Sequence, residues 1–157
     1  MQVETNAVTL REITAQTVRQ VVRLSVAENQ KNYVAANGMS LSQALFAPEA
    51  WYRAIYMGDE PVGFVMLADE SQLSPPPAQP KIGVWRFMVD EKFQGRGIGR
   101  AALVQVIAHA RSKRIFNVLE LSYHPGPGCP EPFYLGLGFM HTGRMDGDEV
   151  VLEITLI

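Results

Sequence analysis

A glycine-rich turn between a strand pattern and a helix pattern constrains the fold of this chain more than any other feature. The turn is residues 94–100, Gln-Gly-Arg-Gly-Ile-Gly-Arg, and it follows the apolar run at residues 84–89. Apolar residues at helical spacing come next: Leu103, Val106, Ile107 and Ala110. Glycines allow close backbone approach and positive φ, and the free N–H groups of a first helical turn attract anions. The sequence therefore predicts an anion-binding loop at the start of a helix.

The spacing of the glycines distinguishes between known phosphate-binding loops. A Walker loop needs Lys-Ser or Lys-Thr after its last glycine, and none follows here. A dinucleotide fingerprint needs Gly-x-Gly-x-x-Gly, whereas Gly95, Gly97 and Gly99 alternate. An ordinary glycine-rich turn is the structural alternative, but Arg96 and Arg100 can both face a pyrophosphate. The segment resembles Gln/Arg-x-x-Gly-x-Gly/Ala, the pyrophosphate loop of the GCN5-related N-acetyltransferase (GNAT) superfamily, which binds acetyl-coenzyme A.

A second segment, residues 133–139, resembles the Tyr-x-x-x-Gly-Phe sequence near the end of the same superfamily. From the residues alone, 131–137 is a short helix closed by Gly138 at its C′ position. Tyr134 is then expected on a helix beside the strand at 118–123, near where that strand diverges from its neighbour. A core tyrosine is the alternative, but the nearby phosphate loop favours a functional residue.

The two ends of the chain carry a closer resemblance. Residues 143–156 predict a strand end, an Asp-Gly turn and a final strand. Together with Glu28-Asn29-Gln30, Asn37 and residues 40–44, they resemble bacterial spermine/spermidine acetyltransferases. The resemblance implies acetyl transfer to a primary amine of a small polycation such as spermidine or spermine. The alternatives are another amine (an amino acid, an aminoglycoside or a protein N-terminus) or a non-catalytic acyl-coenzyme A sensor.

Local patterns elsewhere predict the remaining elements. Residues 7–13 read as a strand, and 51–57 with 62–68 as a hairpin. Thr14 is expected to cap a helix with Val18, Val21, Val22 and Val26 on its apolar face, and Ser40-x-x-Gln43 to open a second helix. The order βααββ then βαβαββ predicts an α+β fold, a mixed sheet of about seven strands flanked by about four helices. This order matches the acetyltransferase fold.

Composition favours a single-domain protein and argues against nucleic-acid and membrane partners. A chain of 157 residues that is 47% hydrophobic predicts one domain, residues 1–157, and a net charge of −2 gives no electrostatic case for nucleic acid. Without a signal segment or a long apolar run, we expect a soluble, cytoplasmic protein with no membrane partner. The single Cys129 excludes an intrachain disulfide, and His109, His124 and His141 lack metal-ligand spacing, so no metal is expected. The resemblance implies a homodimer.

Acetyl transfer needs an anchored donor, an oxyanion stabiliser, and an acid for the departing thiolate. The resemblance implies that acetyl-coenzyme A contacts the loop, the strand before it and the tyrosine of the second segment: Phe87, Met88, Val89, Gln94, Gly95, Arg96, Gly97, Ile98, Gly99, Arg100 and Tyr134. The resemblance also implies that backbone N–H groups around Met88 and Val89, freed by a strand bulge, stabilise the oxyanion; a regular central strand is the alternative. Tyr134 would protonate the thiolate.

The amine must also lose a proton, because a lysine-like pKa of about 10.4 keeps it charged at neutral pH. Some relatives carry a glutamate in the strand before the loop, where this chain has Trp85 and Arg86. Glu28, expected at the end of the first helix, is the leading candidate base, followed by Glu120 and His124. Each of these has a surface or structural role as its alternative.

The expected substrate mouth combines acidic and aromatic residues. Glu28 and Tyr33 would attract a cationic amine through charge pairing and cation–π contact, and Trp85 would line the acceptor channel. A solvated helix end and a core aromatic are the alternatives. Residues 126–130 lack the asparagine that ties the pantetheine arm in many relatives. Cys129 is disfavoured as a nucleophile, because direct transfer needs no covalent intermediate.

Overall fold

A mixed seven-stranded sheet organises the part of the chain that the computed structural model describes, residues 7–157. Residues 1–6 of the predicted domain lie outside the described residues. The strand order is β1-β2-β3-β4-β5-β7-β6, and every pair is antiparallel except β4 with β5. The strands are β1 (Val8–Arg11), β2 (Ala50–Met57), β3 (Glu60–Asp69), β4 (Ile82–Val89), β5 (Val118–Tyr123), β6 (Met140–Asp146) and β7 (Glu149–Thr155).

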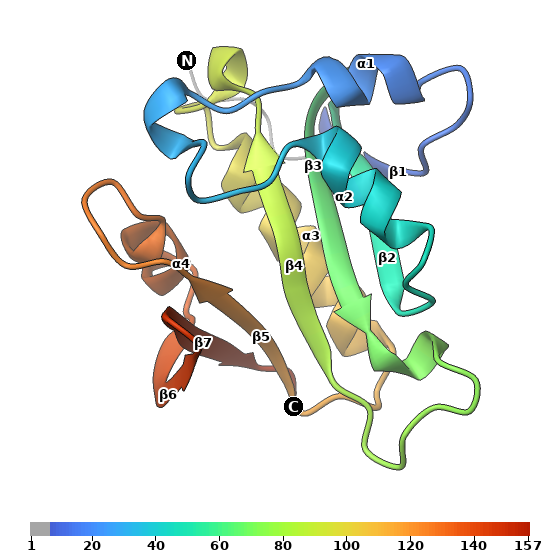
Figure 1. Ribbon diagram of the computed structural model, residues 1–157, viewed down its shortest axis with the longest axis vertical. Coiled ribbons are helices and arrows are strands. Elements are labelled where there is room, and N and C mark those ends of the chain that lie inside the picture. The colour runs from blue at the N-terminus through green and yellow to red at the C-terminus, as the bar shows by residue number, and fades with distance from the viewer. Residues whose placement is uncertain (1–6) are drawn as a thin grey trace.

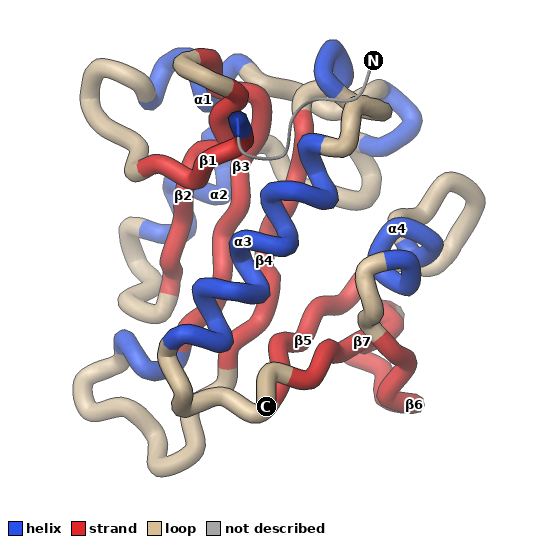
Figure 2. The backbone as a smooth tube through the Cα atoms, turned by 180° about the vertical axis from the view of Figure 1, so that it is seen from behind, coloured by secondary structure: helices blue, strands red, loops and turns tan. Residues whose placement is uncertain are grey.

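Helices cover both faces of this sheet. They are α1 (Val18–Arg23), α2 (Asn37–Ala44), α3 (Ile98–Ser112) and α4 (Glu131–Gly136), with 3₁₀ turns η2 (Glu28–Gln30), η3 (Glu70–Gln72) and η4 (Glu91–Phe93). Figure 1 shows α1 and α2 on one face of β3 and β4, and Figure 2 shows α3 on the opposite face. Helix α4 lies beside β5 and β7 (Figure 1). This arrangement confirms the predicted α+β class and element order.

The central strand β3 is buried on both faces because helices cover each side. Its side chains alternate, so Val65 and Leu67 belong to the core under α3 while Phe64 and Met66 belong to the core under α1 and α2. All four are fully buried. Two apolar layers therefore hold the middle of the sheet rigidly between the helices.

A β-bulge interrupts β4 at Trp85. The pairing with β3 runs in register from Phe64↔Met88 to Met66↔Arg86 and then shifts to Leu67↔Val84, which leaves Trp85 as an extra residue. The side chains of Trp85 and Arg86 consequently both lie on the α1–α2 side. Trp85 packs against that core, and Arg86 Nη2 donates to Gln43 Oε1 of α2 at 3.2 Å.

Strands β4 and β5 pair over a short stretch and then separate. Their parallel pairs run only from Ile82↔Leu119 to Val84↔Leu121, and the rest of β4 has no β5 partner. Figure 1 shows the two strands diverging from this point, with α4 on the far side of the opening. The divergence beside α4 confirms the sequence-based expectation, and it creates the space for a site.

Two helix starts differ from their predictions. Thr17, not Thr14, is the N-cap residue of α1, because residues 14–17 form a turn in which the Val18 N–H bonds to the Thr14 carbonyl at 2.9 Å. Helix α1 also ends at Arg23, so Val26 lies beyond it, and Val22 is 45% exposed.

The predicted capping box at Ser40 is wrong. Helix α2 begins at Asn37, and the Ser40 hydroxyl donates back to the Ala36 carbonyl at 3.4 Å, as a mid-helix serine does. The predicted glycine closure of α4 is confirmed. Gly138 has φ +104°, and the Phe139 and Gly138 N–H groups bond to the Tyr134 and Leu135 carbonyls, which is a Schellman motif.

Candidate active site

The glycine-rich loop ends in the helix N-terminus that the sequence predicts. Gly95 and Gly97 have φ values of +77° and +84°, and an added Cβ at either would meet no atom of the described residues within 4 Å. Gly97 is the N-cap residue of α3, and the first intrahelical bond runs from the Ala101 N–H to the Gly97 carbonyl at 3.1 Å. The N–H groups of residues 98–100 are therefore free of helix partners and face open space that suits a pyrophosphate.

Side-chain hydrogen bonds hold this loop against the rest of the fold. Gln94 Nε2 donates to the Val89 carbonyl and to Gln30 Oε1, both at 2.8 Å. Buried Asp90 accepts from the Ser25 and Lys92 N–H groups at 2.8 and 3.0 Å. Gln94 therefore positions the loop through both of its N–H donors. Sequence reasoning missed Gln30 in this role.

A cavity of about 520 Å³ opens beside the loop. The predicted donor-binding residues line it with the single exception of Arg96: Phe87, Met88, Val89, Gln94, Gly95, Gly97, Ile98, Gly99, Arg100 and Tyr134. Arg96 is exposed, with its guanidinium 5.5 Å from the centroid of the Phe93 ring. We call this space the donor cavity.

The backbone direction of β4 decides which amides face the donor cavity. The Asp90 N–H donates to the Val62 carbonyl of the β3 side at 2.8 Å. Because antiparallel bonds alternate, the Met88 N–H also turns toward β3, and the N–H groups of Phe87 and Val89 turn toward the open edge. The bulge was expected at Met88 and Val89 but lies at Trp85, so Phe87 replaces Met88 as the candidate oxyanion donor. A pattern of period two cannot reveal such a register shift.

A second cavity of about 570 Å³ adjoins the first. We call it the acceptor cavity. Its side-chain and backbone lining shares Tyr33, Val34, Phe87 and Tyr134 with the donor cavity. The two spaces therefore meet in the opening between β4 and β5, and Tyr134 stands where they meet.

Tyr134 is held firmly at this junction. Its ring centroid lies 5.5 Å from that of Phe133 and 5.9 Å from that of Phe139, and the residue is 8% exposed. Burial raises the pKa of its hydroxyl to about 12. Among the described residues the hydroxyl has no hydrogen-bond partner. At neutral pH it is thus an uncharged donor available to a ligand.

Charged groups of both signs line the acceptor cavity, together with one histidine: Lys31, Arg86, Asp146, Glu149 and His124. Arg86 is half-buried, and burial lowers the pKa of its guanidinium while the charge of Glu149 opposes that shift. Its Nη1 and Nη2 donate to the Trp85 carbonyl and to Gln43, but its buried Nε has no hydrogen-bond partner within residues 7–157. Sequence reasoning missed Asp146 and Glu149, because the Asp-Gly turn beside them indicates only a hairpin.

Tyr33 and Trp85, both expected at the substrate mouth, line the cavities. Trp85 lines the acceptor cavity, and Tyr33 lines both cavities. The Tyr33 hydroxyl donates to the Pro127 carbonyl at 2.7 Å, which joins the segment after η2 to the loop before α4 across the opening.

The structure does not bring Glu28 into either cavity. Helix α1 ends at Arg23, so Glu28 begins the separate turn η2 instead of closing the first helix. Its side chain is 88% exposed and pairs with Lys31 at 2.8 Å, a hydrogen bond that raises the pKa of Lys31. The prediction of Glu28 as base and substrate contact therefore lacks structural support.

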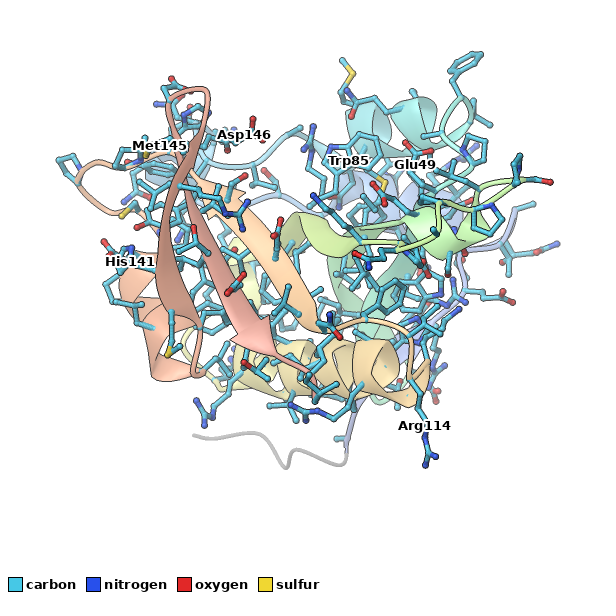
Figure 3. The ribbon with its side chains drawn as sticks, turned by 90° about the horizontal axis from the view of Figure 1, so that it is seen from below. Glu49, Trp85, Arg114, His141, Met145 and Asp146 are labelled. Atoms are coloured by element: carbon cyan, nitrogen blue, oxygen red, sulfur yellow. The ribbon has the colours of Figure 1, made fainter. Side chains whose placement is uncertain are left out.

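Glu120 and His124 have different surroundings. Glu120 accepts from Arg144 Nη2 at 2.7 Å and lines a shallow groove of about 320 Å³ that continues from the acceptor cavity. Figure 3 shows Trp85 and Glu49 together on one side of this region and Asp146 on the other. His124 lines the acceptor cavity itself, with Nδ1 3.5 Å from Asp148 Oδ1 and Nε2 3.9 Å from Glu149 Oε1.

Residues 7–157 also hold little that would suggest a metal centre or a membrane span. No cluster of three or more potential metal ligands occurs there, and no helix in this range has the length and apolar character to span a membrane. Cys129 lines the donor cavity as a free cysteine.

Comparison with known protein families matches residues 19–128 to the Acetyltransferase (GNAT) family. The chain belongs to this family. It is 25% identical to the spermine/spermidine N(1)-acetyltransferase of Bacillus subtilis, over 94% of this chain and 98% of that one. This acetyltransferase is therefore an acetyl-coenzyme A-dependent enzyme of the GNAT type, as the loop and the tyrosine segment predict.

Solved structures share the fold. An acetyltransferase from Thermus thermophilus has a TM-score of 0.70 at 21% identity, covering 99% of both chains. The PaiA N-acetyltransferase from Thermoplasma acidophilum, solved in complex with coenzyme A, has a TM-score of 0.67 at 16% identity, covering 94% of this chain and 98% of that one. These similarities confirm the fold prediction.

Proposed function

We propose that this acetyltransferase moves acetyl from acetyl-coenzyme A directly to a primary amine of a small polycation such as spermidine or spermine. The observation that carries the proposal is the meeting of the donor and acceptor cavities at Tyr134, a buried neutral donor. The Bacillus subtilis relative, named for spermine and spermidine, supports the choice of amine.

The charges beyond Tyr134 also support a cationic acceptor. The acceptor cavity and the groove that continues it are bordered by the carboxylates of Glu49, Glu120, Asp146 and Glu149. Lys31 and Arg86 are the cationic side chains among the same lining residues, with His124 as a titratable third. An elongated polycation could place its reacting amine near Tyr134 and its distal ammonium groups toward Glu49 and Asp146.

The residues of the donor side fit acetyl-coenzyme A, whose thioester supplies the acetyl group. The free amides of residues 98–100 and the α3 dipole would hold the pyrophosphate, and the positive φ of Gly95 and Gly97 shapes the turn that presents these amides. The Phe87 and Val89 amides would stabilise the carbonyl oxygen as it gains charge; such preorganised donors contribute about 3 kcal/mol each. Tyr134 would give its proton to the departing sulfur.

The test is a panel of amines assayed with a thiol-reactive dye. Spermidine, spermine, a monoamine, an amino acid, an aminoglycoside and a peptide N-terminus are each mixed with the protein and acetyl-coenzyme A. Fastest thiol release with the polyamines supports the proposal. Release only with another amine moves the substrate to that class. Tight acetyl-coenzyme A binding in calorimetry without release for any amine supports a sensor instead.

A homodimer, implied by the superfamily resemblance, and a cytoplasmic location, expected from the sequence without a signal segment, belong to the same proposal. Light scattering coupled to size exclusion measures the first directly, and a mass equal to one chain of 17.4 kDa would contradict it.

A further inference from the structure

Glu149 is placed differently from every carboxylate that the sequence singled out. It is the first residue of β7, where side chains alternate between faces. Leu152 and Val150 point to the core under α3, while Glu149 and Val151 take the opposite face, which the acceptor cavity and its groove occupy. The pleat of β7 therefore directs the Glu149 carboxylate toward the space shared with Tyr134.

The Glu149 carboxylate is also more weakly paired than those of the other candidate bases, Glu28 and Glu120. Glu28 and Glu120 are held by Lys31 and Arg144 at 2.8 and 2.7 Å. The ion-pair contact of Glu149 within residues 7–157 is the longer 3.9 Å approach to His124 Nε2, and its side chain is 32% exposed. Glu149 is thus a cavity carboxylate with room for a ligand cation.

We propose that Glu149 receives the ammonium group of the acceptor amine and takes the proton that must leave before attack, with His124 passing that proton to solvent. The inference rests on the proposed amine acetylation and names the base that this reaction needs. Half-exposed His124 lies beside this carboxylate, with Nε2 3.9 Å from Glu149 Oε1, which is longer than a hydrogen bond, so the proton would cross through one bridging water.

Glu149, His124 and Tyr134 together account for every proton that the reaction moves. Glu149 takes one proton from R–NH₃⁺, which leaves the neutral amine. The amine nitrogen bonds to the acetyl carbon as the carbon–sulfur bond breaks, and the electron pair goes to sulfur. Tyr134 protonates the sulfur and regains a proton from the new amide nitrogen. Glu149 then returns its proton through His124, so each turnover releases one proton to water.

Ionisable groups surround Glu149 on several elements, and each affects a pH profile. Arg86 comes from β4, Lys31 and Tyr33 from the segment at η2, His124 from the end of β5, Tyr134 from α4, and Asp146 from β6. Asp148 adds a carboxylate from the turn itself. A pH profile therefore has meaning here only as a comparison between closely matched variants.

Asp148 provides the matched control. It is adjacent to Glu149 and contacts the same histidine, but it is 86% exposed and lines neither cavity. The variants Glu149→Gln and Asp148→Asn each remove one charge beside His124. We expect Glu149→Gln to lower kcat about 10²-fold at pH 7.5 with acetyl-coenzyme A affinity unchanged, and Asp148→Asn to stay within about twofold of wild type.

The pH dependence separates a base from a merely attractive charge. The neutral fraction of an amine with a pKa of about 10.4 rises about tenfold per pH unit below that value, so the deficit of Glu149→Gln should shrink as pH rises. A raised KM with unchanged kcat overturns the proposal, as do equal losses in the two variants. Glu149→Asp, which keeps the charge, should recover part of the rate; a loss equal to that of Glu149→Gln in folded protein also overturns it. A wild-type protein inactive on every amine refutes the proposed function instead.

Discussion

Removing the Tyr134 hydroxyl is the most informative single perturbation of the site. Tyr134→Phe keeps the ring that packs against Phe133 and Phe139 and deletes one oxygen. Because that hydroxyl has no hydrogen-bond partner among the described residues, its removal leaves no other polar group without a hydrogen bond. We therefore expect the free energy of unfolding to change by less than about 1 kcal/mol.

The expected loss of rate follows from two pKa values. The Tyr134 hydroxyl, with a pKa of about 12, is fully protonated in any neutral assay. The departing thiol has a pKa of about 8.5 by analogy with cysteine, so complete proton transfer from the free tyrosine would be uphill by roughly 3.5 units, or ~5 kcal/mol. Such a weak acid helps through partial transfer as negative charge builds on sulfur. We expect the lower end of general-acid effects, about 10²-fold in kcat, or ~2.7 kcal/mol.

The assay is single-turnover thiol release with the best amine, because product release can hide a chemical step in steady-state kcat. Donor affinity is measured in parallel by calorimetry and should not change. A Tyr134→Phe protein that releases thiol at the wild-type single-turnover rate would refute the assignment of Tyr134 as the acid and leave it a packing residue.

Three further predictions concern the loop, the mouth and alkaline pH. Gly97→Ala forces an L-residue into φ +84° at a cost of about 1–2 kcal/mol, and it should weaken acetyl-coenzyme A binding at least tenfold in calorimetry. The control is Gly58→Ala, at φ +59° in the remote β2–β3 turn, which bears similar strain and should leave the affinity unchanged. Equal affinities in the two variants would contradict the anion-binding role. Glu28→Gln should leave kcat and the KM for spermidine within about twofold, because the exposed carboxylate pairs with Lys31; a tenfold rise in KM would instead support Glu28 as a substrate contact. Burial raises the Tyr134 pKa to about 12, so the stabilisation that the neutral hydroxyl gives the folded protein is complete below pH 10 and is lost between about pH 10 and 12. Across that pH window, chemical unfolding should show a smaller loss of stability for Tyr134→Phe than for wild type. Parallel losses in the two proteins would contradict the raised pKa.

The donor half of the site was predictable because its signals are local. The glycines at 95, 97 and 99 specify a turn conformation within a few residues, and Gly138 specifies the end of α4 in the same way. Strand and helix periodicity then supplies the element order. These features depend on neighbouring residues in the sequence, so no tertiary information was needed to read them.

The acceptor half was predicted less completely, because long-range register builds it. The bulge at Trp85 depends on how β3 aligns with β4, and it determines that Arg86 faces α2 and that the Phe87 amide, not the Met88 amide, faces the opening. Glu149 reaches the same cavity only because β7 pairs with β5 through Tyr123↔Val150. Glu28 was misplaced for a local reason, since α1 stops five residues before it.

The central claim, acetyl transfer to a polycation across the junction at Tyr134, is tested most directly by the ratio of two specificity constants. The kcat/KM for spermidine is divided by that for a monoamine of similar length, with thiol release as the common readout. Carboxylates beyond the reacting position can pair with the second charge of spermidine alone, so we expect a ratio of at least about ten, on the order of 1.4 kcal/mol. A ratio near or below one, or thiol release with neither amine, would contradict the account.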